Sequence, residues 1–461
     1  MQQPRDSAMN TVIQPMRWLA GRLDPMTRIL VAGLIFATLS ASANALEIEI
    51  TRGNTDPMPI AVPSLVGNGA DAQLAAEITA IVAADLQRSG IFAPADPATF
   101  IQRDVNPDVA PRFGDWRIIG IQALITGRVA SVAGGQIRTE VRLWDVFAGE
   151  QLVGQSFVTG AENWRRVAHL IADLVYERLT GESGYFDSQI VFIDETGPKD
   201  NRIKRLAVMD QDGANLIYLT GAGDYQLVLT PRFSPNTQDI AYMAYPRVGG
   251  PRVVLFNPET GQEEVLGNFP GATAAPRFSP DGARVILSML EGPDTNIFTY
   301  DLRSGRTLRL TDGASINTSP SYSPNGSQIV FTSDRAGSPK LYVMNADGSN
   351  PTLISRGEGT YSTPVWSPRG DLIAFTRQLN GYFEIGVMRP DGSDIRILTS
   401  RVEVQEGPTW SPNGRVIMFT REIPGENGGP QLWSIDLTGY NEFRIATPNY
   451  ASDPSWSPLL N

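Results

Sequence analysis

Short apolar segments bounded by turn-forming residues recur along the second half of the chain. They are rich in β-branched and aromatic residues and flanked by Asp, Asn, Gly and Ser, which predicts strands joined by tight turns. One set of segments covers 240–245, 285–290, 329–334, 373–378 and 416–421. A second set follows it at 253–257, 297–301, 341–345, 385–389 and 432–436.

These strands belong to a sequence repeat. A Pro-x-aromatic-Ser-Pro motif precedes each strand of the first set, and a further short run such as 308–311 or 395–399 closes the unit. A period of roughly 40–45 residues with several strands per unit indicates the blades of a β-propeller. The six motifs start at Pro231, Pro276, Pro320, Pro364, Pro408 and Pro454, between 44 and 46 residues apart.

The two ends of the repeat array complement each other. Residues 188–220 supply three later strands without a motif before them, whereas the last motif reaches Asn461 with no strands after it. Joining these parts gives six four-stranded blades and a ring closed by one C-terminal strand. Closure removes the unpaired edges that would otherwise invite aggregation.

The preceding region lacks the repeat and predicts a small α+β domain. Its amphipathic segments 71–90 and 162–181 are expected to be helices, each ending at a glycine. Three segments between them, 121–132, 136–146 and 151–160, are expected to be strands. We therefore expect a mainly β protein with an N-terminal α+β domain at 46–182, a linker at 183–187 and the propeller at 188–461.

The N-terminal residues 1–45 have the pattern of a signal peptide. An Arg-containing stretch precedes the apolar run 29–40, which is too short to span a bilayer. Small residues follow, and cleavage is expected between Ala45 and Leu46. Export of a chain without cysteine fits a periplasmic protein, although a short N-terminal anchor is the alternative.

Composition limits the available chemistry. The chain has no Cys and one His, His169, so thiol nucleophiles, disulfides and zinc ribbons are excluded. Its net charge of −11 argues against nucleic acid and anionic membranes as partners. Since no G-x-S-x-G, Walker or H-E-x-x-H motif occurs, we expect no enzyme activity, metal or cofactor. His169 is better interpreted as forming a structural hydrogen bond than as a general base.

The residues just before each motif are expected to surround one mouth of the central channel. Most are small, which leaves an open funnel for a peptide's backbone and side chains. The motif aromatics are better interpreted as packing between blades than as a ligand platform. The funnel residues are Leu229/Thr230, Ala274/Ala275, Thr318/Ser319, Ser362/Thr363, Glu406/Gly407 and Ser452/Asp453.

The whole pattern resembles the TolB family of the Tol–Pal system in Gram-negative bacteria. The residues that carry the resemblance are WRRVAHLIADLVYERLTG (164–181) and the six motif repeats with LYVMNADGS (341–349). The resemblance implies a monomeric, non-enzymatic periplasmic adaptor between the outer-membrane lipoprotein Pal and the inner-membrane protein TolA. Such a protein associates with the outer membrane through Pal and supports envelope integrity and outer-membrane invagination during cell division.

The resemblance also implies partner-binding residues. Pal is expected at the channel mouth, on Ala272, Thr273, Ala275, Thr318, Ser319, Thr363, Glu406 and Asp453. Ser319 stands where the family often has a carboxylate, and Ala272 where some members have histidine. A charge-dependent contact at these two positions is therefore not expected to carry over.

TolA is expected on the segment 46–60, which would be the mature N-terminus. Alternation of apolar and polar residues there suits addition of a strand to a partner's sheet, although a strand of its own domain's sheet is the alternative. The binding residues are expected to be Leu46, Glu47, Ile48, Glu49, Ile50 and Thr51.

Two other functions are compatible with a propeller. One is a module accessory to a hydrolase, but 46–182 is too short for an α/β-hydrolase domain and lacks its nucleophile elbow. The other is a propeller that binds a saccharide or cofactor, which would need exposed aromatics or metal ligands at the channel.

Overall fold

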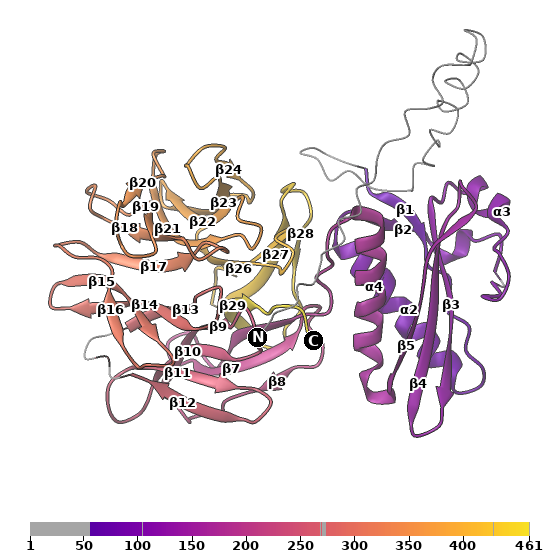
Figure 1. Cartoon of the computed structure of the whole chain (residues 1–461), viewed down its shortest axis with the longest axis horizontal. Helices are drawn as coiled ribbons and strands as arrows, with labels where there is room; N and C mark the ends of the chain where they lie inside the picture. The colour runs from indigo at the N-terminus through magenta and orange to yellow at the C-terminus, as the bar shows by residue number, and fades with distance from the viewer. Residues whose placement is uncertain (1–55, 104, 268, 270–272, 427, 461) are drawn as a thin grey trace, which may run out of the picture. The chain divides into compact units, whose positions relative to one another are not determined.

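The computed structural model describes residues 56–103, 105–267, 269, 273–426 and 428–460. The strands of this part of the chain form one five-stranded sheet and six four-stranded sheets (Figure 1). None of the helices described there is long and apolar enough to cross a membrane.

The five-stranded sheet belongs to the N-terminal α+β region. Its strand order is β2 (Phe92–Pro94), β1 (Met58–Ala61), β3 (Ala123–Val132), β4 (Gln136–Asp145) and β5 (Glu150–Gly160). Strands β3 to β5 confirm the three predicted strands. Strand β1 runs parallel to both β2 and β3, so part of the segment 46–60 does lie in the domain's own sheet.

The helices of this region pack together on that sheet. The two long helices are α2 (Asp71–Arg88) and α4 (Trp164–Thr180), which contact each other as well as the sheet strands. Gly181 takes a left-handed φ of 69° and caps α4 by donating its N–H to Glu177 O. The short elements η1 (Pro97–Thr99), α3 (Phe113–Ile118) and η2 (Ala161–Asn163) were not expected.

Each four-stranded sheet is one blade, named here by its innermost strand. The β9 blade contains β9 (Leu227–Phe233), β10 (Ile240–Tyr245), β11 (Arg252–Asn257) and β12 (Gln262–Leu266). The β13 blade contains β13 (Thr273–Phe278), β14 (Arg284–Glu291), β15 (Asp294–Asp301) and β16 (Thr307–Arg309). The β17 blade contains β17 (Asn317–Tyr322), β18 (Gln328–Ser333), β19 (Lys340–Asn345) and β20 (Thr352–Leu353).

Three further blades complete the ring. The β21 blade contains β21 (Thr360–Trp366), β22 (Ile373–Leu379), β23 (Tyr382–Met388) and β24 (Arg396–Ile397). The β25 blade contains β25 (Gln405–Trp410), β26 (Val416–Glu422), β27 (Pro430–Asp436) and β28 (Glu442–Arg444). The β29 blade joins β29 (Tyr450–Trp456) to β6 (Gln189–Thr196), β7 (Ile203–Asp210) and β8 (Ile217–Tyr218).

The ring is closed as the sequence predicts. Strand β29 pairs antiparallel with β6, with Trp456 opposite Ile190 and Ser455 opposite Val191. The inner strands of neighbouring blades contact one another all the way round, including β29 against β9. The fold is therefore a six-bladed β-propeller with four-stranded blades.

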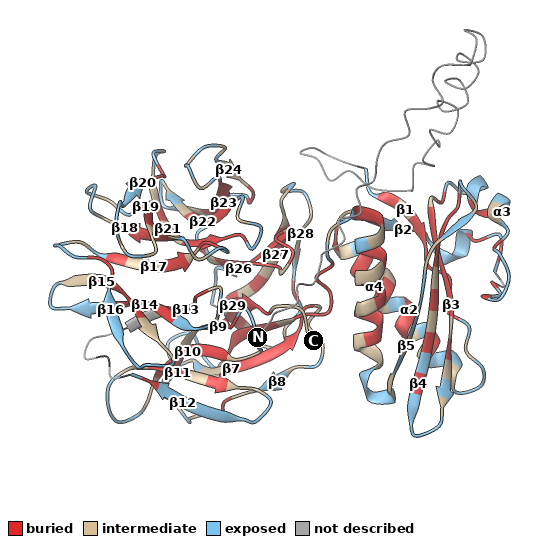
Figure 2. Ribbon diagram, viewed as in Figure 1, coloured by how far each residue is buried: buried red, intermediate tan, exposed pale blue. Residues whose placement is uncertain are grey.

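The core of the propeller lies between the blades. Val365 and Ile385 of the β21 blade pack with Trp410 and Phe419 of the β25 blade in one buried cluster. Burial is concentrated on the inner and middle strands, whereas the outermost strands are largely exposed (Figure 2). Each blade is thus stabilised mainly by its neighbours, as expected for repeats that cannot bury an apolar face alone.

Trp456 tests the importance of closure. It is 7% exposed, donates its indole N–H to Ser188 Oγ at 2.7 Å, and meets the Tyr185 ring edge-to-face. We expect Trp456→Ala to lower the free energy of unfolding by about 3–5 kcal/mol because it leaves a cavity at the closing strand. Urea unfolding followed by far-UV circular dichroism measures this loss.

The matched control is Tyr440→Ala, since Tyr440 is 78% exposed. Its effect is expected to stay within about 0.5 kcal/mol. Equal stability of Trp456→Ala and the wild type would contradict the role assigned to the closing strand.

Candidate functional site

The central channel is built from six equivalent strand interruptions. In every inner strand the ladder with the next strand skips the motif proline and the residue before it. Proline lacks an N–H, so it is tolerated where a bulge interrupts the ladder. The repeated motif therefore places one bulge per blade beside the channel.

The residue before each motif proline has a left-handed backbone in all six blades. This conformation is unusual for any residue except glycine, and it is least favourable for a β-branched threonine. Such strain persists only where the surrounding structure holds it, and it is concentrated at functional sites. The φ values are 48° at Thr230, 53° at Ala275, 53° at Ser319, 47° at Thr363, 68° at Gly407 and 51° at Asp453.

Most of the residues expected to bind Pal lie at or next to these bulges. Ala275, Ser319, Thr363 and Asp453 are left-handed residues and are half-buried. One position earlier in their strands, Thr318 is half-buried and Glu406 is exposed. Thr273 is placed only as part of β13, and Ala272 lies outside the described residues. The residues expected at the TolA segment and the cleavage site, 45–51, also lie outside them.

The region of the bulges is acidic in the last two blades. Glu406 is exposed, yet partial desolvation by the surrounding protein raises the pKa of its carboxyl group. The negative charges of Asp453 and Glu422 raise that pKa further. Asp453 links neighbouring blades, since its carboxylate accepts the backbone N–H of Thr230 at 3.3 Å.

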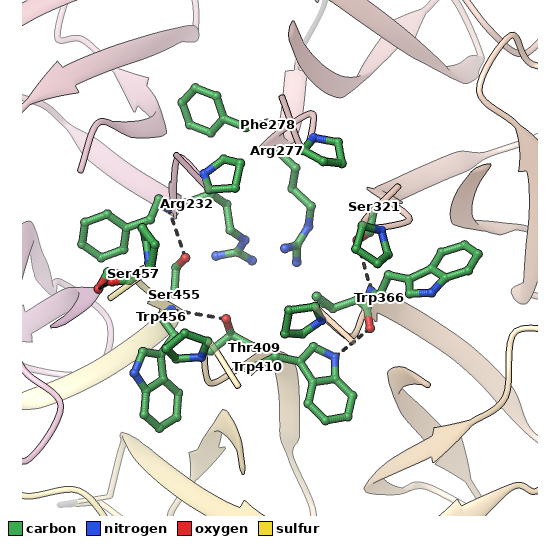
Figure 3. A pocket seen from close by; sticks show the side chains of 18 of the residues that line it. Arg232, Arg277, Phe278, Ser321, Trp366, Thr409, Trp410, Ser455, Trp456 and Ser457 are labelled. Atoms are coloured by element: carbon green, nitrogen blue, oxygen red, sulfur yellow. Dashed lines mark hydrogen bonds between the residues drawn. The ribbon is translucent and has the colours of Figure 1, made fainter. Parts of the chain in front are cut away.

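A cavity of about 380 Å³ lies at the C-terminal ends of the inner strands. It is lined by the last four residues of the motifs, such as Arg232, Phe233, Ser234 and Pro235. Two arginines from adjacent blades, Arg232 and Arg277, direct their guanidinium groups into it (Figure 3). Sequence reasoning missed both, because they occupy the variable second position of the motif. Their presence in only two of six repeats was the signal that could have marked them.

The aromatic residue of the motif has the packing role predicted for it. Trp410 donates its indole N–H to Val365 O of the preceding blade at 3.0 Å. The same wall of the cavity includes the rings of Trp366 and Trp456, each with a bonded indole N–H. These rings contribute to the cavity wall while packing within and between blades.

One group in the described residues has the composition of a metal site. His169, Asp210 and Asp212 offer ligand atoms within 4.8 Å of one another. Other partners already engage them: His169 Nδ1 lies 2.7 Å from Asp85 Oδ2, and Arg165 Nη2 lies 2.5 Å from Asp212 Oδ2. Burial lowers the pKa of His169, but the hydrogen bond and charge of Asp85 outweigh this, so the net pKa is raised. An ion-pair network accounts for the group, consistent with a structural histidine.

Together, the fold and the channel define a six-bladed propeller protein with a small α+β domain before the ring. The chain belongs to the TolB family. Residues 176–460 match the family model described as the TolB beta propeller domain, and residues 46–152 match the TolB amino-terminal domain.

Solved structures are similar to this chain to different extents, and one of them shares its fold over most of its length. TolB from Acinetobacter baumannii is 24% identical and matches with a TM-score of 0.76 over 90% of this chain and 100% of that chain. Kuenenia stuttgartiensis hydrazine synthase is 17% identical, with a TM-score of 0.48 over 58% of this chain and 46% of that chain. A puromycin-hydrolyzing peptidase from Mycobacterium tuberculosis is 14% identical, with a TM-score of 0.38 over 69% of this chain and 53% of that chain.

The bulge strain can be tested at Thr230, whose left-handed φ is 48° and whose buried hydroxyl has no hydrogen-bond partner. We expect Thr230→Gly to raise the free energy of unfolding by about 1 kcal/mol because glycine adopts this conformation without a Cβ penalty. Thr352→Gly, on the outer strand β20, makes the same chemical change at an ordinary φ and should lower stability by about 0.5–1 kcal/mol. Equal losses in the two variants, measured by urea unfolding, would show that the bulge is not strained.

Proposed function

We propose that this protein is a non-enzymatic periplasmic adaptor of the Tol–Pal system. In this role it links the outer-membrane lipoprotein Pal to the inner-membrane protein TolA. It thereby supports outer-membrane invagination during cell division and the integrity of the envelope. Family membership together with the open, strained mouth of the propeller channel is the observation that carries the proposal.

The channel mouth supports an assignment as the Pal site. Its left-handed residues are mostly small, and the bond from Thr230 N to Asp453 links two blades there, which favours a funnel preorganised for a protein segment. The carboxylates of Glu406 and Asp453 add negative charge on one side of the mouth. A basic or amide-rich loop of Pal would complement this side, whereas Ser319 supplies a neutral contact elsewhere.

A binding role is also more consistent with the state of the single imidazole. His169 is 3% exposed and is bound to Asp85, so it does not face solvent where a substrate could meet it. A general base must come within hydrogen-bond reach of the proton that it abstracts. We therefore assign no catalytic role to His169.

Thr318→Arg tests the Pal site. Thr318 is half-buried beside the bulge of β17, so a long cationic side chain should fill the funnel and weaken Pal binding at least tenfold. Isothermal titration with purified Pal measures the affinity. The control is Leu308→Arg, which adds the same side chain on the exposed outer strand β16. Unchanged Pal affinity of a folded Thr318→Arg variant would place Pal elsewhere.

Deletion of residues 46–57 tests the TolA site. The deletion ends before β1, which starts at Met58, so the five-stranded sheet keeps all its strands. We expect TolA binding to be lost and Pal binding to be retained, both measured by titration on the same preparation. Retained TolA affinity would refute the assignment of this segment, and loss of both partners would indicate damage to the fold.

A further inference from the structure

The cavity at the C-terminal ends of the inner strands has a lining that favours anions. It holds about 380 Å³, and none of the residues that line it is aspartate or glutamate. The walls are formed mainly by aromatic rings and by the Ser-Pro pairs that end the inner strands. The side chains of this lining therefore supply no negative charge.

Two arginines occupy equivalent positions in this wall. Arg232 extends from β9 and Arg277 from the neighbouring β13, and their guanidinium groups point toward each other in the cavity (Figure 3). Such an approach of like charges is unfavourable unless an anion lies between them.

Neither guanidinium is satisfied by the protein. Arg232 is 8% exposed, and among the described residues it makes one hydrogen bond, from Nη1 to the backbone oxygen of Pro231 at 2.6 Å, while its Nε has no partner there. Arg277 has no hydrogen bond or ion pair with the residues that the structure describes, and its Nε is buried. Several N–H donors therefore face the cavity without acceptors.

The electrostatics agree with this geometry. Burial lowers the pKa of Arg232, although the charge of Asp453 partly offsets the effect. Burial lowers the pKa of Arg277 well below its usual value, and the positive charge of Arg232 lowers it further. Arginine nevertheless stays protonated in proteins, so the cavity carries two charges that need a counter-ion.

Three hydroxyl groups at the same position of other blades add further donors. Ser321, Thr409 and Ser455 each accept a backbone N–H from the following blade, those of Trp366, Trp456 and Phe233 respectively. One acceptor lone pair of each hydroxyl is thus used by the protein. Each hydroxyl hydrogen remains to be donated, and the three residues line the cavity.

We propose that this cavity binds a small multivalent oxyanion between Arg232 and Arg277. Planar guanidinium groups match the oxygens of phosphate and carboxylate groups in bidentate geometry, and such charge-assisted bonds are strong where water is excluded. Two positive charges favour a dianion such as hydrogen phosphate or a dicarboxylate over chloride. The site involves neither Pal nor TolA. Its test is therefore independent of the tests of the proposed function.

Titration of the mature protein with inorganic phosphate tests the site, with succinate as the dicarboxylate arm. Binding is followed by calorimetry and by the fluorescence of the cavity tryptophans Trp366, Trp410 and Trp456, against sodium chloride at equal ionic strength. We expect saturable binding and a rise in the thermal midpoint with one or both oxyanions, because a ligand that binds only the native state stabilises it. The ligand that binds more tightly, phosphate or succinate, identifies the kind of oxyanion that the cavity prefers. Responses to both that equal the chloride response would overturn the proposal.

Substitutions then locate the binding. Arg277→Gln and Arg232→Gln are each expected to weaken binding at least tenfold. Without oxyanion, each should have a thermal midpoint no lower than the wild type because the repulsion is removed. The control is Arg284→Gln, since the Arg284 side chain in the same blade is 54% exposed and lies outside the cavity. Oxyanion affinity equal to that of the wild type in a folded Arg277→Gln or Arg232→Gln variant would refute the site. Loss of oxyanion binding in the Arg284→Gln control would also refute it.

Discussion

The pairing of β29 with β6 is the constraint on which the rest of the structure depends. An open array of six sheets would leave a first and a last face without an apolar neighbour, and an inner strand missing from one blade. Hydrogen bonds between Tyr450–Trp456 and Gln189–Thr196 supply that strand and bring the two ends of the array together. The entropic cost of closing so long a loop rises only with the logarithm of its length, so interblade packing can offset it.

Closure also explains why the channel is lined by strained residues. Six inner strands converge on one axis, and each carries a proline that cannot donate to its ladder. A bulge with one left-handed residue bends the strand at this point. The bond from Thr230 N to Asp453 links the bulges of two neighbouring blades.

The channel combines two electrostatic environments. Carboxylates of Glu406 and Asp453 lie near the bulges of the last two blades, whereas the guanidinium groups of Arg232 and Arg277 lie beyond the bulges of two others. The interaction of Arg232 with Asp453 shows that the two groups are coupled electrostatically. Acidic and basic groups are therefore separated along the inner strands.

Several features were predictable because they arise from local or periodic chemistry. The motif spacing predicted six blades, the incomplete terminal units predicted the closing strand, and apolar periodicity predicted α2, α4 and β3 to β5. The short strands β1 and β2 were harder to recognise, since their parallel pairing joins residues more than thirty positions apart and leaves no local pattern.

The amino-acid sequence by itself determined the repeat, the number of blades and the positions of the prolines, because strand and turn propensities act over a few residues. Only the tertiary structure decided that Arg232 and Arg277, 45 positions apart, share one cavity without a carboxylate in its lining. It also decided that Thr230 and Thr363 adopt a left-handed backbone, which their own side chains disfavour. Contacts across the closed ring impose both features, and a single repeat cannot show such contacts.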